Sequence, residues 1–405
     1  MHILSHTNRQ EFLATPQLVR VCYAKDEDGR IKPTLLVKAD SLLLKYILLG
    51  SAIRMTFTKF HDQILYALRV DDDQEAPAIL WSFVATVSEL DAARTMLSDK
   101  TVPIYLFNEV AVNIGSCEMI IAGDTNAMRS ILGMEFVSDK TPALTEELRV
   151  VLDELALAKS KNQRWELLHL HRTSDWNLYR NTYITEGGTA NIIDMDDTNE
   201  GGQQENLGVW LTDRLQPQGV YHSPQRPYRD RETRELTDLL LTHQYGTILV
   251  ESKTLSVFAR KNLPPRSKLK RDLTGIIRKG FGQLEGAVRT LKSDAVITST
   301  DGKPLEIERE PPAHAVMLIP DIHLVEDRGL YNGTFIRGFI DRTNSFPHIL
   351  DVSELLRIVQ AAEIISNRSN SVTKIMAFDY YLIERVKKAI SADSLCIEVI
   401  LRIGD

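Results

Sequence analysis

The sequence predicts an α/β protein of the α+β kind, in which a mixed sheet flanked by helices follows an N-terminal α+β domain. The chain has 405 residues, which is too long for one ordinary core, so two or three domains are expected. Strand-like segments with period-two alternation are interspersed with segments of helical spacing. We place the N-terminal domain at residues 1–165, a linker and flexible loop at 166–203, and a second domain at 204–405.

The N-terminal domain is predicted to combine several strands with two helices. Its helices are expected at 88–97 and at 145–159, and the second has acidic residues in its first turn, where they favour the helix dipole. No catalytic group of residues is evident here, so we expect this domain to regulate, to sense a ligand or to form oligomers. The expected strands are 34–37, 53–60, 64–70, 78–86 and 103–107.

The linker is predicted from a change in composition. Residues 185–206 are rich in Gly, Asn, Asp, Thr and Gln, which bury little apolar surface, so a mobile loop is expected. The acids there do not fit a calcium loop, because the glycine and the terminal glutamate of the EF-hand pattern are misplaced.

The second domain is predicted to be a compact mixed sheet with helices on its faces. Its expected order is helix, strand, strand, helix, strand and then two helices, which suits such a layered domain. The elements are helix 205–215, a Pro-rich turn region, two strands joined at Tyr245-Gly246, helix 273–292, a hairpin at Asp301-Gly302, strands 315–320 and 348–351, helices 353–365 and 372–390, and a last strand 395–403.

The two joined strands contain the most informative motif of the chain. Asp238 begins the first apolar segment, and the second ends in Glu251-Ser252-Lys253. Because strand side chains alternate faces, Glu251 and Lys253 project on the same side, about 7 Å apart along the backbone. Two carboxylates and a lysine at one sheet edge suit a hard divalent cation and a water to be activated.

Two other interpretations of these residues were weighed. Glu-x-Lys on an exposed strand is often an ordinary salt bridge, but the apolar residues 247–250 indicate a strand through the core whose charges emerge at its end. Glu235 competes with Asp238 as a ligand. It lies three residues earlier, on the opposite face of an extended strand, so Asp238 is favoured.

Basic residues follow the motif directly. The net charge of the chain is −7, yet residues 253–292 contain eleven basic residues against two acids, a local charge of +9. A polyanion is the natural partner of such a segment, and its binding should depend strongly on salt. The residues expected to bind nucleic acid are Arg266, Lys268, Lys270, Arg271, Arg278 and Lys279.

These features together resemble the PD-(D/E)xK nucleases, the restriction-endonuclease-like superfamily. The resemblance rests on Asp238 with Glu251-x-Lys253, followed by a helix that carries Gln283. The runs Lys279-Gly-Phe-Gly-Gln283-Leu-Glu-Gly-Ala287 and Pro347-His-Ile-Leu-Asp-Val-Ser-Glu-Leu355 are similar to those of a group of bacterial proteins of this superfamily. The resemblance covers roughly residues 200–400. It departs from the superfamily's motif at Thr237, where the superfamily's name has Pro.

The resemblance implies a restriction-endonuclease-like sheet and a set of site residues. Asp238 and Glu251 would bind Mg²⁺, with Mn²⁺ expected to substitute, and the Ser252 backbone carbonyl and Glu205 would complete the metal ligands. Lys253 would position or deprotonate the attacking water, and Gln283 would orient the site or touch the scissile strand.

The expected function is therefore a Mg²⁺-dependent nuclease, a DNA endonuclease regulated by its N-terminal domain, with RNA as a second substrate class. A homo-oligomer, dimer or tetramer, is expected, and a role in bacterial defence against phage follows by analogy alone. The alternative is a non-catalytic nucleic-acid-binding or scaffold protein that keeps a nuclease-like fold. Three scattered cysteines, no secretory signal and no long apolar run indicate a cytoplasmic protein without a membrane partner.

Overall fold

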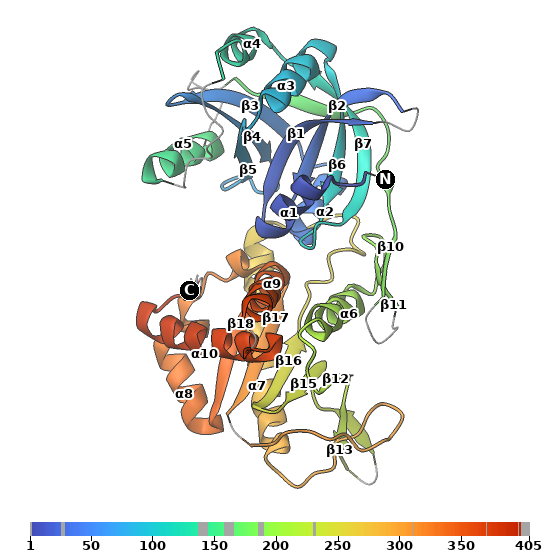
Figure 1. Cartoon of the computed structure of the whole chain (residues 1–405), viewed down its shortest axis with the longest axis vertical. Coiled ribbons are helices and arrows are strands. Elements are labelled where there is room, and N and C mark those ends of the chain that lie inside the picture. Colours follow the sequence, from blue (N-terminus) through green and yellow to red (C-terminus); the bar gives the residue numbers. More distant parts are fainter. Residues whose placement is uncertain are drawn as a thin grey trace. The chain divides into compact units, whose positions relative to one another are not determined.

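The computed structural model describes residues 2–25, 29–136, 145–157, 166–184, 190–229, 232–310, 312–369, 371–395 and 397. The chain divides into two compact units (Figure 1). The first comprises Met1–Asn181 with Lys261–Pro265, and the second comprises Thr182–Arg260 with Arg266–Asp405. Both units combine helices with sheets, so the expected α+β class is confirmed.

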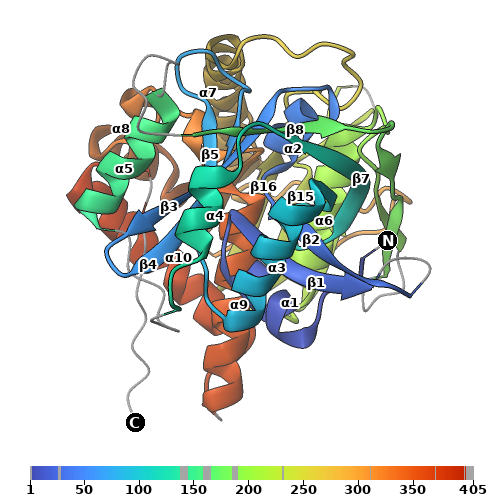
Figure 2. The same ribbon diagram turned by 90° about the horizontal axis from the view of Figure 1, so that it is seen from above.

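The first unit is built on one large sheet. Its strands follow the order β1-β2-β6-β7-β8-β3-β4-β5, with β9 paired to β7. The edge strands β1 and β5 contact each other, so the sheet curls, and α3 and α4 pack side by side (Figure 2). The elements are α1 (His6–Ala14), β1 (Leu18–Lys25), β2 (Ile31–Lys38), α2 (Ser41–Leu48), β3 (Ile53–Phe60), β4 (Gln63–Val70), β5 (Ala78–Phe83), α3 (Val87–Asp99), β6 (Thr101–Phe107), β7 (Asn113–Ala122), α4 (Asn126–Leu132), α5 (Glu146–Leu157), β8 (Leu168–Arg172) and β9 (Asn177–Leu178).

The five strands and two helices expected in the first unit are all present, as β2–β6, α3 and α5. The end of the second expected helix, residues 158 and 159, lies outside the described residues. One segment differs from expectation. Residues 168–172, assigned by sequence to the linker, form β8 between β7 and β3. Leu168 and Leu170 are buried there while the residues after them face outward, which is the period-two pattern of a half-buried strand.

The second unit contains a five-stranded mixed sheet and two small two-stranded sheets. Its elements are β10 (Asn181–Ile184), β11 (Ala190–Ile193), α6 (Glu200–Asp213), β12 (Gly219–His222), β13 (Gln225–Pro227), β14 (Thr233–Glu235), β15 (Leu239–His243), β16 (Gly246–Ser252), α7 (Arg266–Leu291), β17 (Ala313–Ile319), the short 3₁₀ helices η1 (Ile322–Leu324) and η2 (Arg328–Tyr331), α8 (Gly333–Thr343), β18 (Ser345–Asp351), α9 (Val352–Arg368) and α10 (Lys374–Ala392).

The main sheet has the order β12-β15-β16-β17-β18. β12, β15 and β16 run antiparallel to one another, whereas β16, β17 and β18 are parallel. Helices cover both faces. Gly208 of α6 lies against Leu318, and Gly280 of α7 lies against Met317. Because Met317 and Leu318 are consecutive strand residues and point to opposite faces, α6 and α7 lie on opposite sides of the sheet.

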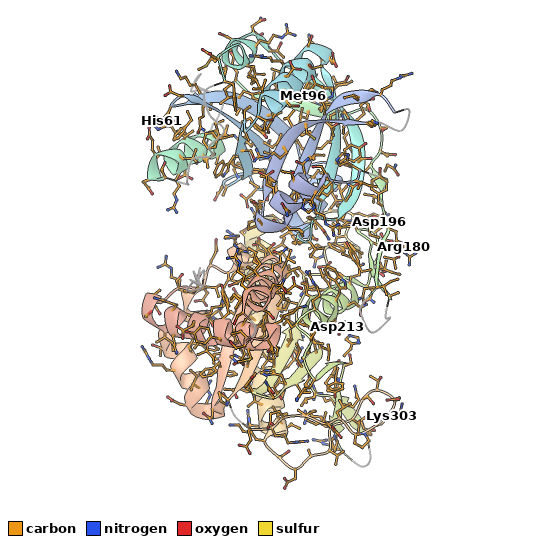
Figure 3. The ribbon with its side chains drawn as sticks, in the orientation of Figure 1. His61, Met96, Arg180, Asp196, Asp213 and Lys303 are labelled. Carbon is orange, nitrogen blue, oxygen red and sulfur yellow. The ribbon has the colours of Figure 1, made fainter. Side chains whose placement is uncertain are left out.

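The order of elements expected for this unit is present, with additions. The strands β12–β14 and the helix α8 were not predicted. The basic helix begins at Arg266 instead of residue 273, directly after Pro265, so part of the expected loop is helical. The expected hairpin at 301–302 is present in its smallest form, a turn closed by one antiparallel bridge between Thr298 and Pro304. Lys303 (Figure 3) pairs with Asp301 of this turn at 2.7 Å.

Three further expectations concern the linker, the last strand and the membrane. The expected loop at 185–206 contains β11 and the first half of α6, and residues 185–189 lie outside the described residues. The last strand expected at 395–403 lies almost entirely outside them. Across the ranges that the structure describes, no helix is both long enough and apolar enough to cross a membrane.

A buried ion pair links α9 and α10 of the second unit. The Arg385 side chain on α10 is fully buried, and its Nε donates to Glu354 Oε1 of α9 at 2.7 Å. Its Nη2 also donates to the Ile349 carbonyl of β18 at 2.9 Å. One guanidinium thereby links two helices to the edge of the sheet.

Candidate active site

Strand register brings Asp238 and Glu251 together. In the hairpin β15–β16, Leu239 pairs with Val250 and His243 pairs with Gly246. Continuing this register by one residue places Asp238, just before β15, opposite Glu251 near the end of β16. The two-residue turn at 244–245 therefore decides that these carboxylates are neighbours, since a register shift of one residue would send one of them to the other face.

Two hydrogen bonds fix the Asp238 loop to the neighbouring strand. The Ser252 backbone N–H donates to Asp238 Oδ2 at 2.6 Å, and the buried Thr237 hydroxyl donates to the Val250 carbonyl at 2.7 Å. The side chain at 237 thus contributes a bond that proline could not make.

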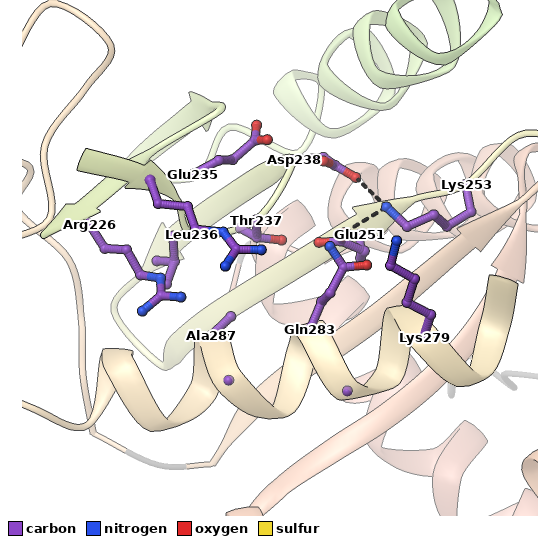
Figure 4. A pocket seen from close by; sticks show the side chains of 13 residues that line it. Arg226, Glu235, Leu236, Thr237, Asp238, Glu251, Lys253, Lys279, Gln283 and Ala287 are labelled. Carbon is purple, nitrogen blue, oxygen red and sulfur yellow. Dashed lines mark hydrogen bonds and ion pairs between the residues drawn. The ribbon is translucent and has the colours of Figure 1, made fainter. Parts of the chain in front are cut away.

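Lys253 joins the two carboxylates. Its Nζ lies 2.6 Å from Glu251 Oε1 and 3.7 Å from Asp238 Oδ2 (Figure 4). Gln204 of α6 holds the end of β16 in place. Its amide donates to the Ser252 hydroxyl at 2.9 Å and to the Lys253 carbonyl at 3.2 Å. The structure therefore brings Asp238, Glu251 and Lys253 into one ion-paired group.

Helix α7 supplies the opposite wall of the site. A Cβ on Gly280 would lie 2.2 Å from the Met317 side chain and 3.8 Å from Lys253 Cε, so glycine permits the helix to approach this closely. Lys279 and Gln283 then point from α7 toward the Lys253 ammonium (Figure 4). Gln283 Oε1 is buried and accepts no hydrogen bond from the residues described here. An unsatisfied buried amide oxygen is costly, so it indicates a missing donor or cation.

These walls enclose a cavity of about 430 Å³. Most of the side chains that line the cavity are polar. The carboxylates of Asp238 and Glu251 lie among four cationic side chains. The cations are Arg226 and Arg234 of the hairpin β13–β14, with Lys253 and Lys279. The α7 side of the cavity is lined by the small residues Gly282, Gly286 and Ala287.

The carboxylates are held in an environment that opposes their ionisation. Burial, followed by the charge of Glu251, raises the pKa of Asp238 to about 7. Burial also raises the pKa of Glu251, although the hydrogen bond and charge of Lys253 act in the other direction. For Lys253, burial opposes the ammonium, but its hydrogen bond to Glu251 and the two carboxylate charges outweigh burial and raise its pKa. Lys253 therefore stays protonated. Positive charge next to Asp238 and Glu251 favours their ionised forms.

Glu205 is placed differently from the other expected ligands. Its Oε2 accepts a hydrogen bond from His222 Nε2 at 3.1 Å, and that bond raises the pKa of His222. Within the described ranges, no three or more His, Cys, Asp or Glu side chains lie close enough together to hold a metal ion. Glu205 thus lies near enough for its charge to act on Asp238, Glu251 and Lys253, but its carboxylate is engaged by His222 and does not complete a three-ligand group with Asp238 and Glu251 among the described residues.

The donor set still fits a hard cation. Asp238 and Glu251 offer carboxylate oxygens, and Gln283 offers the unpartnered amide oxygen described above. All are oxygen donors, which is the set that Mg²⁺ and Mn²⁺ prefer, with water filling the remaining positions. The expected Ser252 carbonyl is at the same strand end, in a buried residue.

Of the six basic residues expected to bind nucleic acid, one lines this cavity, namely Lys279. Three others pair with acids of the same unit and so are partly neutralised. These pairs are Arg266 with Asp321, Lys270 with Glu326 and Arg278 with Asp327. Lys268 and Arg271 are exposed on the first turns of α7.

Sequence reasoning misjudged or missed several site residues. Glu235 is exposed and lines the same cavity as Asp238. Glu235 does not lie on the opposite face of one extended strand, as expected, because β14 ends at Glu235 and the chain bends before β15 begins at Leu239. Arg226 and Arg234 were overlooked because their hairpin is short and polar, with no apolar alternation to reveal it.

Comparison with protein-family models, with curated proteins and with solved structures finds no match for this chain.

Proposed function

We propose that this protein is a divalent-metal-dependent nuclease that hydrolyses phosphodiester bonds, with DNA the leading substrate and RNA the second. The observation that carries the proposal is the cavity in which Asp238 and Glu251 meet Lys253 under a rim of further cations. Buried carboxylates attract a divalent cation, and a cationic rim attracts a phosphodiester, so the cavity suits both reactants of such a hydrolysis.

Each side chain has a distinct task in this proposal. Asp238 and Glu251 would hold Mg²⁺ or Mn²⁺, with the Gln283 amide oxygen and the Ser252 carbonyl as further donors. Bound there, the metal would neutralise charge on the scissile phosphate and lower the pKa of a nearby water. Lys253 would stabilise the charge that develops on the phosphate. Its raised pKa favours this electrostatic task, and the positioning of water, over deprotonating the water.

The fold supports the same proposal. The order α6, β12, β15, β16, α7, β17 gives a mixed sheet with helices on both faces, and the motif residues lie where β15 begins and β16 ends. A restriction-endonuclease-like architecture is the corresponding fold proposal. Regulation by the N-terminal domain, a homo-oligomeric state and a defence role stay predictions.

One observation favours the alternative, a nucleic-acid-binding protein without turnover. The Lys253 ammonium already contacts both carboxylates, so the pair is neutralised in part without a metal. Such a protein would bind nucleic acid through the cationic rim and would show no Mg²⁺ or Mn²⁺ affinity that depends on Glu251.

Cleavage assays separate the two functions. Linear, circular, nicked and single-stranded DNA, and RNA, are incubated with the full chain in Mg²⁺, in Mn²⁺ and in EDTA. We expect cleavage that EDTA abolishes and that Lys253→Ala lowers by about 10²–10³-fold, the usual cost of one charge-stabilising group. Asp238→Ala should abolish it. Lys388→Ala, which changes an exposed lysine on α10 outside the cavity, is the matched control and should cut like wild type. If the wild-type protein cuts none of these substrates, the proposed nuclease activity is refuted.

Protonation of Asp238 gives the assay a second readout. Because its pKa is raised to about 7, Asp238 must lose a proton before its carboxylate can take a cation. At limiting Mg²⁺, cleavage is therefore expected to increase as the pH rises through about 7.

A further inference from the structure

Two arginines face each other across the small hairpin at the cavity rim. Arg226 of β13 and Arg234 of β14 are register partners in an antiparallel pair, and both line the cavity. Like charges directly opposite each other destabilise a hairpin. Neither arginine forms an ion pair with an acid in the described part of the chain, and the Arg234 guanidinium lies over the Tyr228 ring, 5.8 Å from its centroid. Among the described residues the two charges are therefore not offset by an ion pair, and a bound anion would offset them.

The wall that faces these arginines is open. Gly282 and Gly286 of α7 line the cavity, and a Cβ added to either would meet nothing within 4 Å. Glycine inside a helix costs about 1 kcal/mol relative to alanine, and packing does not require glycine at these two positions. The Arg226 side chain extends toward the α7 side of the cavity, to the left of Ala287 in Figure 4. The cavity thus lies between the carboxylates, the arginine pair and a stretch of α7 in which two of the lining residues, Gly282 and Gly286, have no side chain.

We propose that Arg226 and Arg234 form a phosphate clamp that holds the sugar–phosphate backbone of a nucleic-acid strand beside the Asp238–Glu251–Lys253 group. The clamp rests on the proposed function and deepens it, because it names the residues that position the strand. Guanidinium groups bind phosphate oxygens in a planar, two-point fashion, which suits a pair aimed at one site. The glycine surface gives the strand room, and Lys279 on α7 contributes a cation on the opposite rim.

The clamp is tested by the salt dependence of binding. A fluorescein-labelled oligonucleotide, single-stranded or duplex, is titrated with the full chain in EDTA over a range of NaCl concentrations, with anisotropy as the readout. Each lost phosphate contact lowers the slope of log K against log salt by about 0.7 for a single strand or about 0.9 for a duplex. The double variant Arg226→Gln/Arg234→Gln should therefore bind more weakly, with a slope shallower by about 1.4–1.8.

Arg229→Gln is the matched control. Arg229 lies on the same hairpin, is exposed, contacts the Tyr228 ring at 5.7 Å and does not line the cavity. It should keep the wild-type slope. Because the double variant removes a like-charge pair, its melting temperature should be equal to or above that of wild type, so weak binding cannot be ascribed to unfolding. An unchanged slope in the double variant overturns the clamp.

The outcomes also separate the clamp from the nuclease. If wild type cuts but the double variant binds with the wild-type slope, the clamp is wrong and the nuclease stands. If the double variant binds with the predicted shallower slope while wild type cuts no substrate, the clamp stands and the proposed nuclease activity is wrong.

Discussion

Removing the charge of Asp238 should stabilise the folded protein while abolishing the proposed activity. Asp238→Asn keeps the shape of the side chain and an oxygen that can accept the Ser252 N–H. It removes a carboxylate whose pKa is raised from 3.8 to about 7 by burial and by Glu251. A shift of about three units corresponds to a cost of about 4 kcal/mol for ionising this group in the folded state. The Asp238 side chain is 12% exposed, so solvent screens this cost little.

The sign of the pH dependence follows from the raised pKa. Between the unfolded value of 3.8 and about 7, the folded protein binds the Asp238 proton more tightly than the unfolded chain does. Stability therefore falls as the pH rises through this window. The Asn variant lacks this fall. From about pH 5 to about pH 8, its stability relative to wild type should increase by roughly 2–3 kcal/mol.

Urea unfolding of wild type and Asp238→Asn at the two pH values, followed by circular dichroism, measures this difference. Titrating groups that do not interact with Asp238 contribute equally to both proteins and cancel. Metal is kept out with EDTA, since a cation would stabilise the wild type selectively. If Asp238→Asn is less stable than wild type by the same amount at both pH values, the carboxylate is not held against its preference, and the electrostatic reasoning is refuted.

Three more predictions concern single contacts. Thr237→Val should leave the Val250 carbonyl without its buried donor and cost about 1–3 kcal/mol, measured by urea unfolding; an unchanged midpoint would show that this bond does not anchor the Asp238 loop. Arg385→Gln should cost about 3–5 kcal/mol, because it leaves the Glu354 charge buried without its partner, and a thermal melt within a degree of wild type would contradict this. Burial, followed by nearby cationic groups, lowers the pKa of His348 well below 6.5, so the unfolded chain gains a proton first and stability should fall as the pH drops below about 6.5. His348→Gln should flatten that dependence, and an equally steep slope in the variant would assign it to other groups.

Elements with a clear hydrophobic period were predictable from sequence. β3, expected and found at 53–60, alternates apolar and polar residues from Ile53 to Thr58, and the β15–β16 hairpin followed from two apolar runs around Gly246. α2 was missed because residues 42–47 are all buried, so its apolar run shows no helical period. The start of α7 was misplaced because basic residues conceal its first turns, although Pro265 marks its beginning.

The site was predictable where local register decides it and unpredictable where tertiary contacts do. The approach of Asp238 to Glu251 follows from a short turn between two strands. The engagement of Glu205 by His222 and the position of Arg226 at the rim depend on how α6 and the small hairpin pack. No spacing in the sequence encodes those contacts.

The most direct test of the central claim is the location of Mn²⁺ by anomalous diffraction from crystals grown with the metal. Asp238 and Glu251 are proposed to hold one divalent cation together. We predict an anomalous peak in their cavity at about 2.1 Å from a carboxylate oxygen of each, with the Lys253 ammonium no longer bridging the pair. Crystals that bind Mn²⁺ elsewhere, with no peak between Asp238 and Glu251, would contradict the account.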